Sequence, residues 1–133
     1  MQRAGFTMIE LIFVIVILGI LSAVAVPKMM GMSEKADASV CKSYYGTLNR
    51  TVGPNLWANM SIDDKNASEA FATTEIEKQI KTPANGKCGS IDDISKAATD
   101  GTDFTVDIGG TTYDINATQA TKEQAPTWNF HKE

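Results

Sequence analysis

The chain has 133 residues, of which 43% are hydrophobic and 21% are charged, and its formal net charge is −4. This length leaves room for one small domain beside an apolar segment. The acidic balance excludes a sequence-wide attraction for nucleic acid or anionic lipid. The two cysteines and the single histidine, His131, lack the spacing of metal ligands, so metal catalysis is not expected.

The first element in chain order is an apolar segment over residues 6–26, in which Glu10 is the only charged residue. About 20 apolar residues at ~1.5 Å per residue span the ~30 Å of a bilayer core, so we expect a membrane-spanning helix. A carboxylate at that depth costs roughly 2.5–3.5 kcal/mol on insertion scales. Glu10 therefore needs a partner that neutralises its charge.

Three interpretations of this segment are open. A secretory signal peptide would use the small residues 22–25 for cleavage, but it would carry Glu10 inside its apolar core. A plain membrane anchor explains the length and leaves Glu10 unpaired. The third interpretation starts from the run Ala4–Leu11 (AGFTMIEL), which resembles the leader of type IV pilins and type II secretion pseudopilins. The resemblance covers residues 1–27.

This resemblance implies how the segment is processed. In the family a prepilin peptidase removes a leader, here residues 1–5, and methylates the new N-terminal amine. Carried over to this sequence, the cut falls between Gly5 and Phe6, and Phe6 is methylated. Glu10 matches the family glutamate that is thought to pair with the N-terminal amine of a neighbouring subunit. Residues 6–27 are then the transmembrane and assembly helix, and pairing of the two charges satisfies Glu10 in a filament.

The resemblance also implies partners and a location. The partners are further copies and related pilin-like subunits, the prepilin peptidase, and the platform protein and ATPase of the assembly machine. The sequence contains no glycine-rich nucleotide-binding loop, so we expect the chain to be moved by that machine and not to drive it. The expected location is the bacterial inner membrane, crossed once, with a periplasmic head; after assembly it is a periplasmic or extracellular filament.

Helical periodicity continues beyond Pro27. Residues 28–53 predict the amphipathic half of one long helix. Its expected apolar stripe comprises Ala36, Val40, Tyr44 and Leu48, flanked by Cys41, Tyr45 and Val52. Gly53 and Pro54 are expected to end the helix, because glycine suits a C-terminal cap and proline cannot donate a backbone hydrogen bond.

Gly19 and Pro27 weaken the first half of this helix, since glycine adds unfolded-state freedom and proline removes a hydrogen bond. In assembled filaments of the resembling family, the matching segment is often unwound. The resemblance makes unwinding of residues 19–27 one expectation, and a simple kink at Pro27 is the alternative.

Residues 54–133 are expected to form a globular head. A short helix is predicted over residues 68–81, followed by a loop over residues 82–86. Alternating residues on both sides of a Gly-Gly pair, residues 109–110, predict a β-hairpin, and residues 127–130 predict a third strand. The predicted fold class is α+β, a long helix packed on a small antiparallel sheet, as the pilin resemblance also implies.

Cys41 and Cys88 are the two cysteines. If the head lies outside the cytoplasm, a disulfide is expected; in a cytosolic protein they would be free thiols. A Cys41–Cys88 bridge would join the long helix to the loop before the sheet. That departs from the common type IV pilin pattern, in which two cysteines near the C-terminus enclose a loop, and it favours a pseudopilin or a specialised pilin.

Five aspartates gather in the second half of the head: Asp92, Asp93, Asp100, Asp103 and Asp107. Major pseudopilins hold a calcium ion in a C-terminal loop, and oxygen ligands suit that cation. The spacing here matches no calcium motif well, and turn formation is the other interpretation. No other cofactor and no metal site are expected.

Four Asn-x-Ser/Thr sites occur, at Asn49, Asn59, Asn66 and Asn116. Asn66 and Asn116 also have an aspartate two residues earlier, which resembles the acceptor pattern of bacterial N-glycosylation. Chance matches in a chain rich in Asn, Asp and Thr are the alternative.

The favoured function is that of a structural subunit, not an enzyme, in a type IV pilin-like filament: a pseudopilin of a type II secretion or related transformation system. The alternative is a major or minor type IV pilin of a surface pilus for adhesion, twitching or DNA uptake. A membrane-anchored periplasmic binding or enzymatic domain is a third class, against which the Gly-Phe-Glu arrangement argues.

Overall fold

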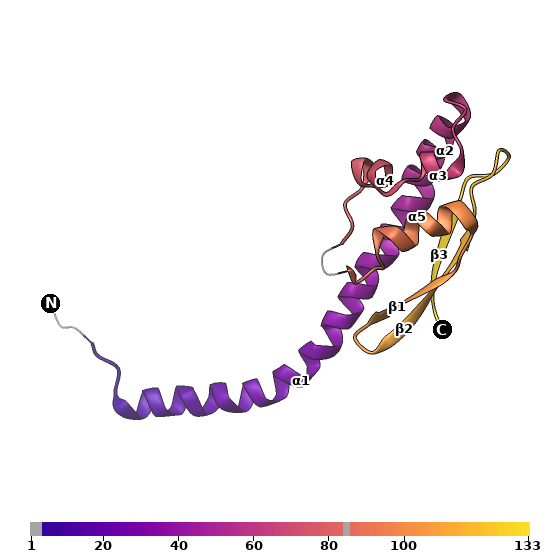
Figure 1. Ribbon diagram of the computed structural model, residues 1–133. Helices are drawn as coiled ribbons and strands as arrows, with labels where there is room; N and C mark the ends of the chain where they lie inside the picture. Colours follow the sequence, from indigo (N-terminus) through magenta and orange to yellow (C-terminus); the bar gives the residue numbers. More distant parts are fainter. Residues whose placement is uncertain (1–3, 84–85) are drawn as a thin grey trace. The chain divides into compact units, whose positions relative to one another are not determined.

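The computed structural model describes residues 4–83 and 86–133, apart from the side chain of residue 30, and it divides into two units, residues 1–35 and Ala36–Glu133. Residues 1–3 of the expected leader and residues 84–85 of the expected loop lie outside the described residues. Helix α1 (Met8–Thr47) begins in the first unit and ends in the second (Figure 1).

The first unit is an exposed apolar helix. Within the described residues, the helical stretch Met8–Ile62 is the one long and apolar enough to cross a membrane, with a mean hydropathy of 2.9 in its most apolar window. The Ser22 hydroxyl donates to the carbonyl of Leu18 at 2.7 Å, so this polar group is satisfied within the helix, as lipid requires. α1 stays helical through Gly19 and Pro27 in the single subunit, and unwinding in a filament stays a prediction.

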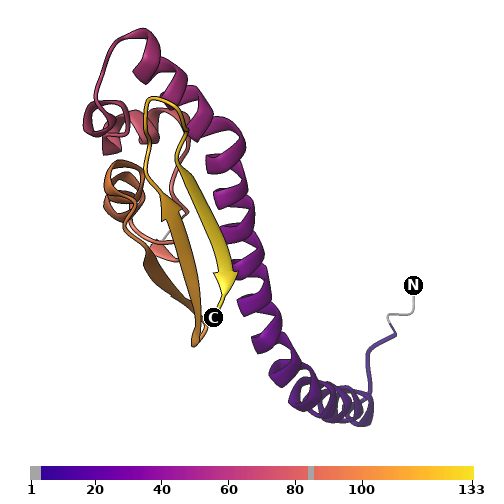
Figure 2. The ribbon, with the colours of Figure 1, turned by 90° about the vertical axis from the view of Figure 1, so that its right-hand side faces the viewer.

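The second unit is the expected α+β head. After α1 come a π-helical turn, η1 (Leu48–Val52), and then α2 (Gly53–Ile62), α3 (Ala67–Ala70), α4 (Thr73–Gln79) and α5 (Ile91–Asp100). The strands are β1 (Phe104–Ile108), β2 (Thr111–Thr118) and β3 (Thr127–Lys132), in the sheet order β1-β2-β3 and all antiparallel. Within this unit β3 lies beside the helix, as Figure 2 shows, and contacts η1.

The hairpin and the third strand are confirmed. Gly109 and Gly110 have φ angles of 59° and 82°, which two-residue hairpin turns of this kind require and which glycine adopts without strain. Phe104 pairs with Ile115 and Val106 pairs with Tyr113, so the apolar faces of both strands coincide. β3 extends two residues beyond the expected strand, to Lys132.

The predicted end of the long helix at Gly53–Pro54 is wrong. The Gly53 N–H bonds to the carbonyl of Leu48, five residues back, so the helical ladder is already widened where the proline enters. Pro54 then lies in the first turn of α2. A residue at this position does not need a backbone N–H to form the helix, so proline is tolerated there. The amphipathic part of the helix therefore runs to Ile62 and not to residue 53.

The role of Gly53 is close packing. A Cβ atom at Gly53 would lie 2.9 Å from the carbonyl oxygen of Leu48 and 3.2 Å from the ring atom Cζ3 of Trp128. A Cβ atom at Gly46, also within the helix, would meet no atom within 4 Å. The two glycines are thus a matched pair, one with a packing requirement and one without.

We expect Gly53→Ala to destabilise the head by about 1–3 kcal/mol, because the added methyl group overpacks the helix against Trp128. Gly46→Ala is the control and should be neutral or stabilising by up to about 1 kcal/mol, since alanine favours helix. Urea unfolding of both variants, followed by tryptophan fluorescence, measures the difference. Equal stabilities would show that the close approach at Gly53 is not a constraint.

The core-facing stripe of the helix begins later than expected. Ala36 and Val40 are exposed, Val40 by 52%, so the predicted stripe is wrong at these two positions. The buried side starts at Cys41, where the segment around Cys88 first covers the helix, and it continues beyond the expected end. Its members are Cys41, Tyr44, Tyr45, Leu48, Val52, Leu56 and Met60.

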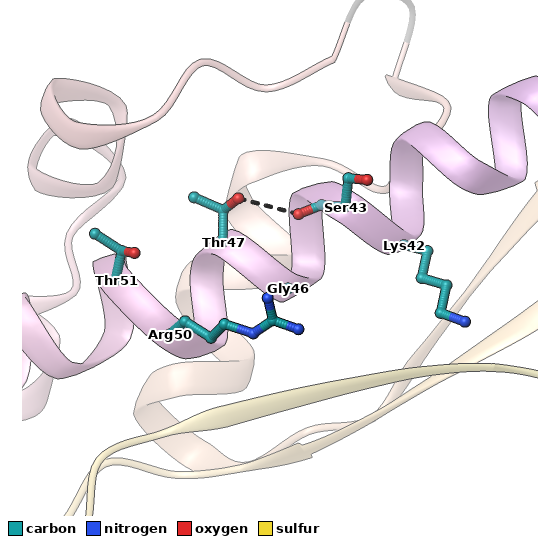
Figure 3. Close-up of a pocket in the computed structure, with 6 residues that line it drawn as sticks. All are labelled: Lys42, Ser43, Gly46, Thr47, Arg50 and Thr51. Atoms are coloured by element: carbon teal, nitrogen blue, oxygen red, sulfur yellow. Dashed lines mark hydrogen bonds between the residues drawn. The ribbon is translucent and has the colours of Figure 1, made fainter.

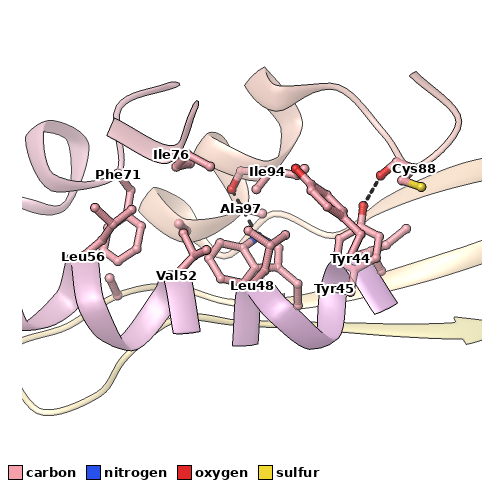
Figure 4. Close-up of a cluster of buried hydrophobic side chains, with 14 of the residues drawn as sticks. Tyr44, Tyr45, Leu48, Val52, Leu56, Phe71, Ile76, Cys88, Ile94 and Ala97 are labelled. Atoms are coloured by element: carbon pink, nitrogen blue, oxygen red, sulfur yellow. Dashed lines mark hydrogen bonds between the residues drawn. The ribbon is translucent and has the colours of Figure 1, made fainter. Parts of the chain in front are cut away.

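The core lies between this stripe, the short helices and the sheet (Figure 4). Phe130 of β3 stacks between Tyr45 of α1 and Tyr113 of β2, with ring centroids 5.5 Å and 4.8 Å apart. The indole Nε1 of Trp128 donates to the carbonyl of Ile94 at 3.2 Å. These contacts join α1, the sheet and α5 into one hydrophobic core.

Asn49 fastens the helix to the edge of the sheet. Its Oδ1 accepts the backbone N–H of Trp128 at 2.8 Å, and its Nδ2 donates to the Trp128 carbonyl at 2.7 Å. A single amide side chain thus satisfies both backbone groups that Trp128 turns toward the helix.

The expected helix over residues 68–81 is two helices, α3 and α4. Phe71 is fully buried between them, and Ala72 is extended with ψ of 147°, which interrupts the helical backbone. Asn66 begins α3 with a capping box to Glu69. Burial of Phe71 therefore interrupts a segment whose residues would otherwise favour one continuous helix.

Helix α5 was not predicted, although its signals are present in the sequence. Ser90 Oγ accepts the Asp93 N–H at 3.1 Å as an N-cap, and Gly101, with φ of 73°, ends the helix. Ile94, Ala97 and Ala98 are buried at helical spacing. The aspartates in its first turn suit the helix dipole.

Candidate processing and assembly site

The residues predicted for processing lie at the start of the first unit. Gly5 and Phe6 precede α1 and are exposed, Phe6 by 85%. The peptide bond between them therefore lies outside the helix. Phe6, Ile9, Glu10, Phe13 and Val14 line a mostly apolar hollow of about 400 Å³.

Glu10 has a hydrogen-bonding partner within its own chain, Thr7. The backbone N–H of Thr7 donates to Glu10 Oε2 at 2.9 Å, and the Thr7 hydroxyl donates to the same oxygen at 3.1 Å. The Glu10 N–H lies 3.4 Å from Thr7 Oγ1, so Thr7 and Glu10 form a capping box at the start of α1. The T-x-x-E spacing in the sequence carries this signal, although the capping box was not predicted from it.

The capping box orients the carboxylate without neutralising it. Both donors belong to Thr7 and are uncharged, so they supply no counter-charge for the Glu10 carboxylate in the apolar hollow. Cutting between Gly5 and Phe6 leaves the Phe6–Thr7 bond intact, and the Thr7 N–H is still available. A processed chain would therefore retain both residues of the cap, and a cation would be needed to neutralise the carboxylate.

Of the two alternatives for Cys41 and Cys88, a disulfide or two free thiols, the structure has the disulfide. The disulfide joins α1 to the segment before α5, with 5.2 Å between the two Cα atoms, and both residues are fully buried. The Tyr45 hydroxyl donates to the Cys88 carbonyl beside it, and burial raises the pKa of that phenol far above its ordinary value. On the outer side, Lys87 Nζ lies 2.8 Å from Asp37 Oδ2.

The five aspartates do not converge. Asp100 Oδ1 accepts the N–H of Thr102 at 2.9 Å, and the hydrogen bonds from Thr102 lower the pKa of this carboxyl. Asp103 Oδ1 accepts the N–H of Ala117 at 2.7 Å. Among residues 4–83 and 86–133, no three His, Cys, Asp or Glu side chains are grouped to hold a metal. Calcium binding stays an expectation from sequence alone.

A basic surface hollow of about 480 Å³ lies on the outer side of the helix, centred on Gly46 (Figure 3). Lys42 and Arg50 flank this glycine one helical repeat away on each side, and no carboxylate is among the lining residues. The hollow is lined by Lys42, Ser43, Gly46, Thr47, Arg50 and Thr51. It is a positively charged surface on an acidic chain, and sequence reasoning did not single it out.

Comparison with known proteins places the N-terminal segment in a defined class. Residues 1–26 match the prokaryotic N-terminal methylation motif. Type II secretion system core protein G of Aeromonas hydrophila is 56% identical over 36 residues, which are 27% of this chain and 25% of that protein. The same protein of Klebsiella pneumoniae is 58% identical over 38 residues, which are 28% of this chain and 27% of that protein.

Core protein G of Pseudomonas aeruginosa is 49% identical over 41 residues, covering 31% of this chain and 29% of that protein. The chain thus spans about a quarter of the length of the curated relatives that it matches. No solved structure matches it. Motif and fold together identify a pilin-like chain that carries the prepilin-type N-terminal methylation motif and is similar, over that segment, to type II secretion system core protein G.

Proposed function

We propose that this protein is a structural, non-enzymatic subunit of a type IV pilin-like filament, a pseudopilin of a type II secretion or related system. The methylation motif over residues 1–26, which contains Gly5, Phe6 and Glu10, is the observation that carries the proposal. The similarity to core protein G over the same residues favours secretion over a surface pilus. A major or minor type IV pilin is the second candidate, and the position of the Cys41–Cys88 disulfide argues against it.

The proposed life cycle follows from the physics of the first unit. Before assembly, α1 crosses the inner membrane once with the head in the periplasm, and a prepilin peptidase cuts between Gly5 and Phe6. The new methylated amine of one subunit then pairs with Glu10 of another as α1 leaves lipid for the filament. The exposed apolar side chains of α1 pack against other copies or related pilin-like subunits there. A platform protein and an ATPase drive this transfer.

A Gly5→Val chain tests the processing step. We expect it to stay in the inner-membrane fraction with its leader attached, because a β-branched side chain replaces the residue at the cut. The wild-type chain should be recovered as the shorter form in filaments sheared from cells that overproduce the secretion system. Recovery of uncut Gly5→Val protein in sheared filaments would contradict the proposal.

A further inference from the structure

The loop between α2 and α3 carries one of the two acid-preceded Asn-x-Ser sites, Asp64-Lys65-Asn66-Ala67-Ser68. We propose that Asn66 is an acceptor for an N-linked glycan and that Asn116, in the matching sequence Asp-x-Asn-x-Thr, is not. The inference rests on the proposed function, which puts the head on the periplasmic side where such a transfer takes place. It adds a modification site to the filament subunit.

The atom that would be modified is free at Asn66. The side-chain oxygen Oδ1 accepts the N–H of Glu69 at 2.9 Å as the cap of α3. The side-chain nitrogen Nδ2 makes no hydrogen bond within the described residues, and Asn66 is exposed. A glycan on Nδ2 leaves Oδ1 in place, so glycosylation and capping are compatible.

Asn49 and Asn116 differ in this respect, and Asn59 differs in its sequence and its place in a helix. Nδ2 of Asn49 donates to the Trp128 carbonyl at 2.7 Å, and modifying it would release the sheet from the helix. Nδ2 of Asn116 lies 3.4 Å from Asp103 Oδ2. Asn59 is exposed, but it lies in the last turns of α2 and has Trp57, not an acid, two residues before it.

Of the two acid-preceded sites, Asn66 also has the backbone that opens locally at the lower cost. α3 has four residues, far fewer than a helix needs to be stable alone, so its local opening costs little. Asp64, Asn66 and Ser68 are all exposed. Asn116 lies in the central strand β2, paired with Asn129 of β3, and an enzyme could bind it only by separating the sheet.

The chemistry is a glycosyl transfer from a lipid-pyrophosphate-linked saccharide. Asn66 Nδ2 attacks the anomeric carbon, a carbon–nitrogen bond forms, and the bond between that carbon and the pyrophosphate oxygen breaks. The lipid pyrophosphate leaves with the electron pair, and a base of the transferase takes one proton from Nδ2. The product carries a bulky hydrophilic group on the α2–α3 loop.

Peptide mass spectrometry of the protein purified from its producing organism reads all four sites separately. Trypsin places them in four different peptides, residues 43–50, 51–65, 66–78 and 97–122. We expect a saccharide mass on peptide 66–78 and the unmodified mass on peptide 97–122. An unmodified 66–78 peptide, or equal occupancy of 66–78 and 97–122, overturns the inference.

Four variants expressed in the same organism separate the sequence requirement from folding. Asn66→Asp keeps the capping oxygen and removes the amide, and Ser68→Ala removes a hydroxyl that makes no hydrogen bond in the described residues; both should abolish the added mass. Ser68→Thr should retain it. Asp64→Asn should lower occupancy at least about tenfold without straining the backbone, because asparagine tolerates the positive φ of 50° at this position.

The same sample distinguishes failure of this inference from failure of the proposed function. A methylated Phe6 terminus together with an unmodified Asn66 contradicts only the glycan. An intact Met1 contradicts the filament function, whatever Asn66 carries. Modification that survives in Ser68→Ala would contradict the assignment of the site.

Discussion

The Glu10→Ala chain is expected to enter the membrane as well as the wild type and to be absent from filaments. An unpaired carboxylate in lipid costs roughly 2.5–3.5 kcal/mol, and pairing in the filament removes that cost. Alanine removes both the cost of the carboxylate in lipid and the free energy gained by pairing it in the filament. The equilibrium ratio of subunit in filaments to subunit in the membrane therefore falls by about 100-fold. The ratio of subunit in sheared filaments to subunit in the inner membrane measures this change.

The capping box requires two matched variants. Glu10→Gln keeps a side chain that can accept the Thr7 N–H but removes the charge, and we expect it to fail like Glu10→Ala. Thr7→Ala removes the hydroxyl partner of the box and keeps the charge, and we expect it to assemble. If Glu10→Gln assembled normally without wild-type subunits, the carboxylate would act by capping α1 and not by pairing with an amine.

Loss of the Cys41–Cys88 disulfide should have the largest effect on stability in the head. The bridge closes a separation of 47 residues, which corresponds to about 4 kcal/mol on the chain-entropy account. For a unit of this size that lowers the melting temperature by roughly 15–30 °C. The measurement is thermal unfolding of the full chain in detergent, comparing the wild type with the double variant Cys41→Ala/Cys88→Ala.

Lys87→Ala is the control for that experiment. It lies beside Cys88 and removes the ion pair with Asp37 while leaving the disulfide in place. Because both partners of this pair are partly exposed, we expect a loss below about 1 kcal/mol. Equal melting temperatures for Lys87→Ala and the double alanine variant would show that the cross-link does not stabilise the head.

How far the sequence predicts this protein depends on whether a feature is local. The hairpin follows from two alternating runs around Gly109–Gly110, and local turn chemistry determined it. The N-terminal methylation motif is contiguous in sequence, so its match over residues 1–26 needs no tertiary information, and the roles of Gly5, Phe6 and Glu10 stay predictions. The disulfide was one of two possibilities, and its choice depended on the compartment.

The wrong predictions of helix boundaries arose where tertiary packing determines where a helix ends. Gly53 looked like a helix cap, but it is there because Trp128, distant in sequence, packs against the helix at that point. Phe71 divides a segment of helical propensity because its ring enters the core. Helix α5 and the Thr7–Glu10 capping box were missed although local signals mark them in the sequence: an N-cap residue begins each helix, and Gly101 ends α5.

The basic hollow at Gly46 could also be recognised only from the three-dimensional arrangement of its residues. Lys42 and Arg50 are unremarkable as single charges on a helix. Only the observation that no carboxylate lines the hollow between them reveals an uncompensated positive surface.

The central claim is that the intramembrane carboxylate belongs to a processed, polymerising subunit, and the mature N-terminus tests it most directly. Mass spectrometry of the protein extracted from native membranes should find a chain that begins at Phe6 and carries one methyl group on its amine. A chain that begins at Met1, or that has lost residues up to the end of the apolar segment, would contradict the account.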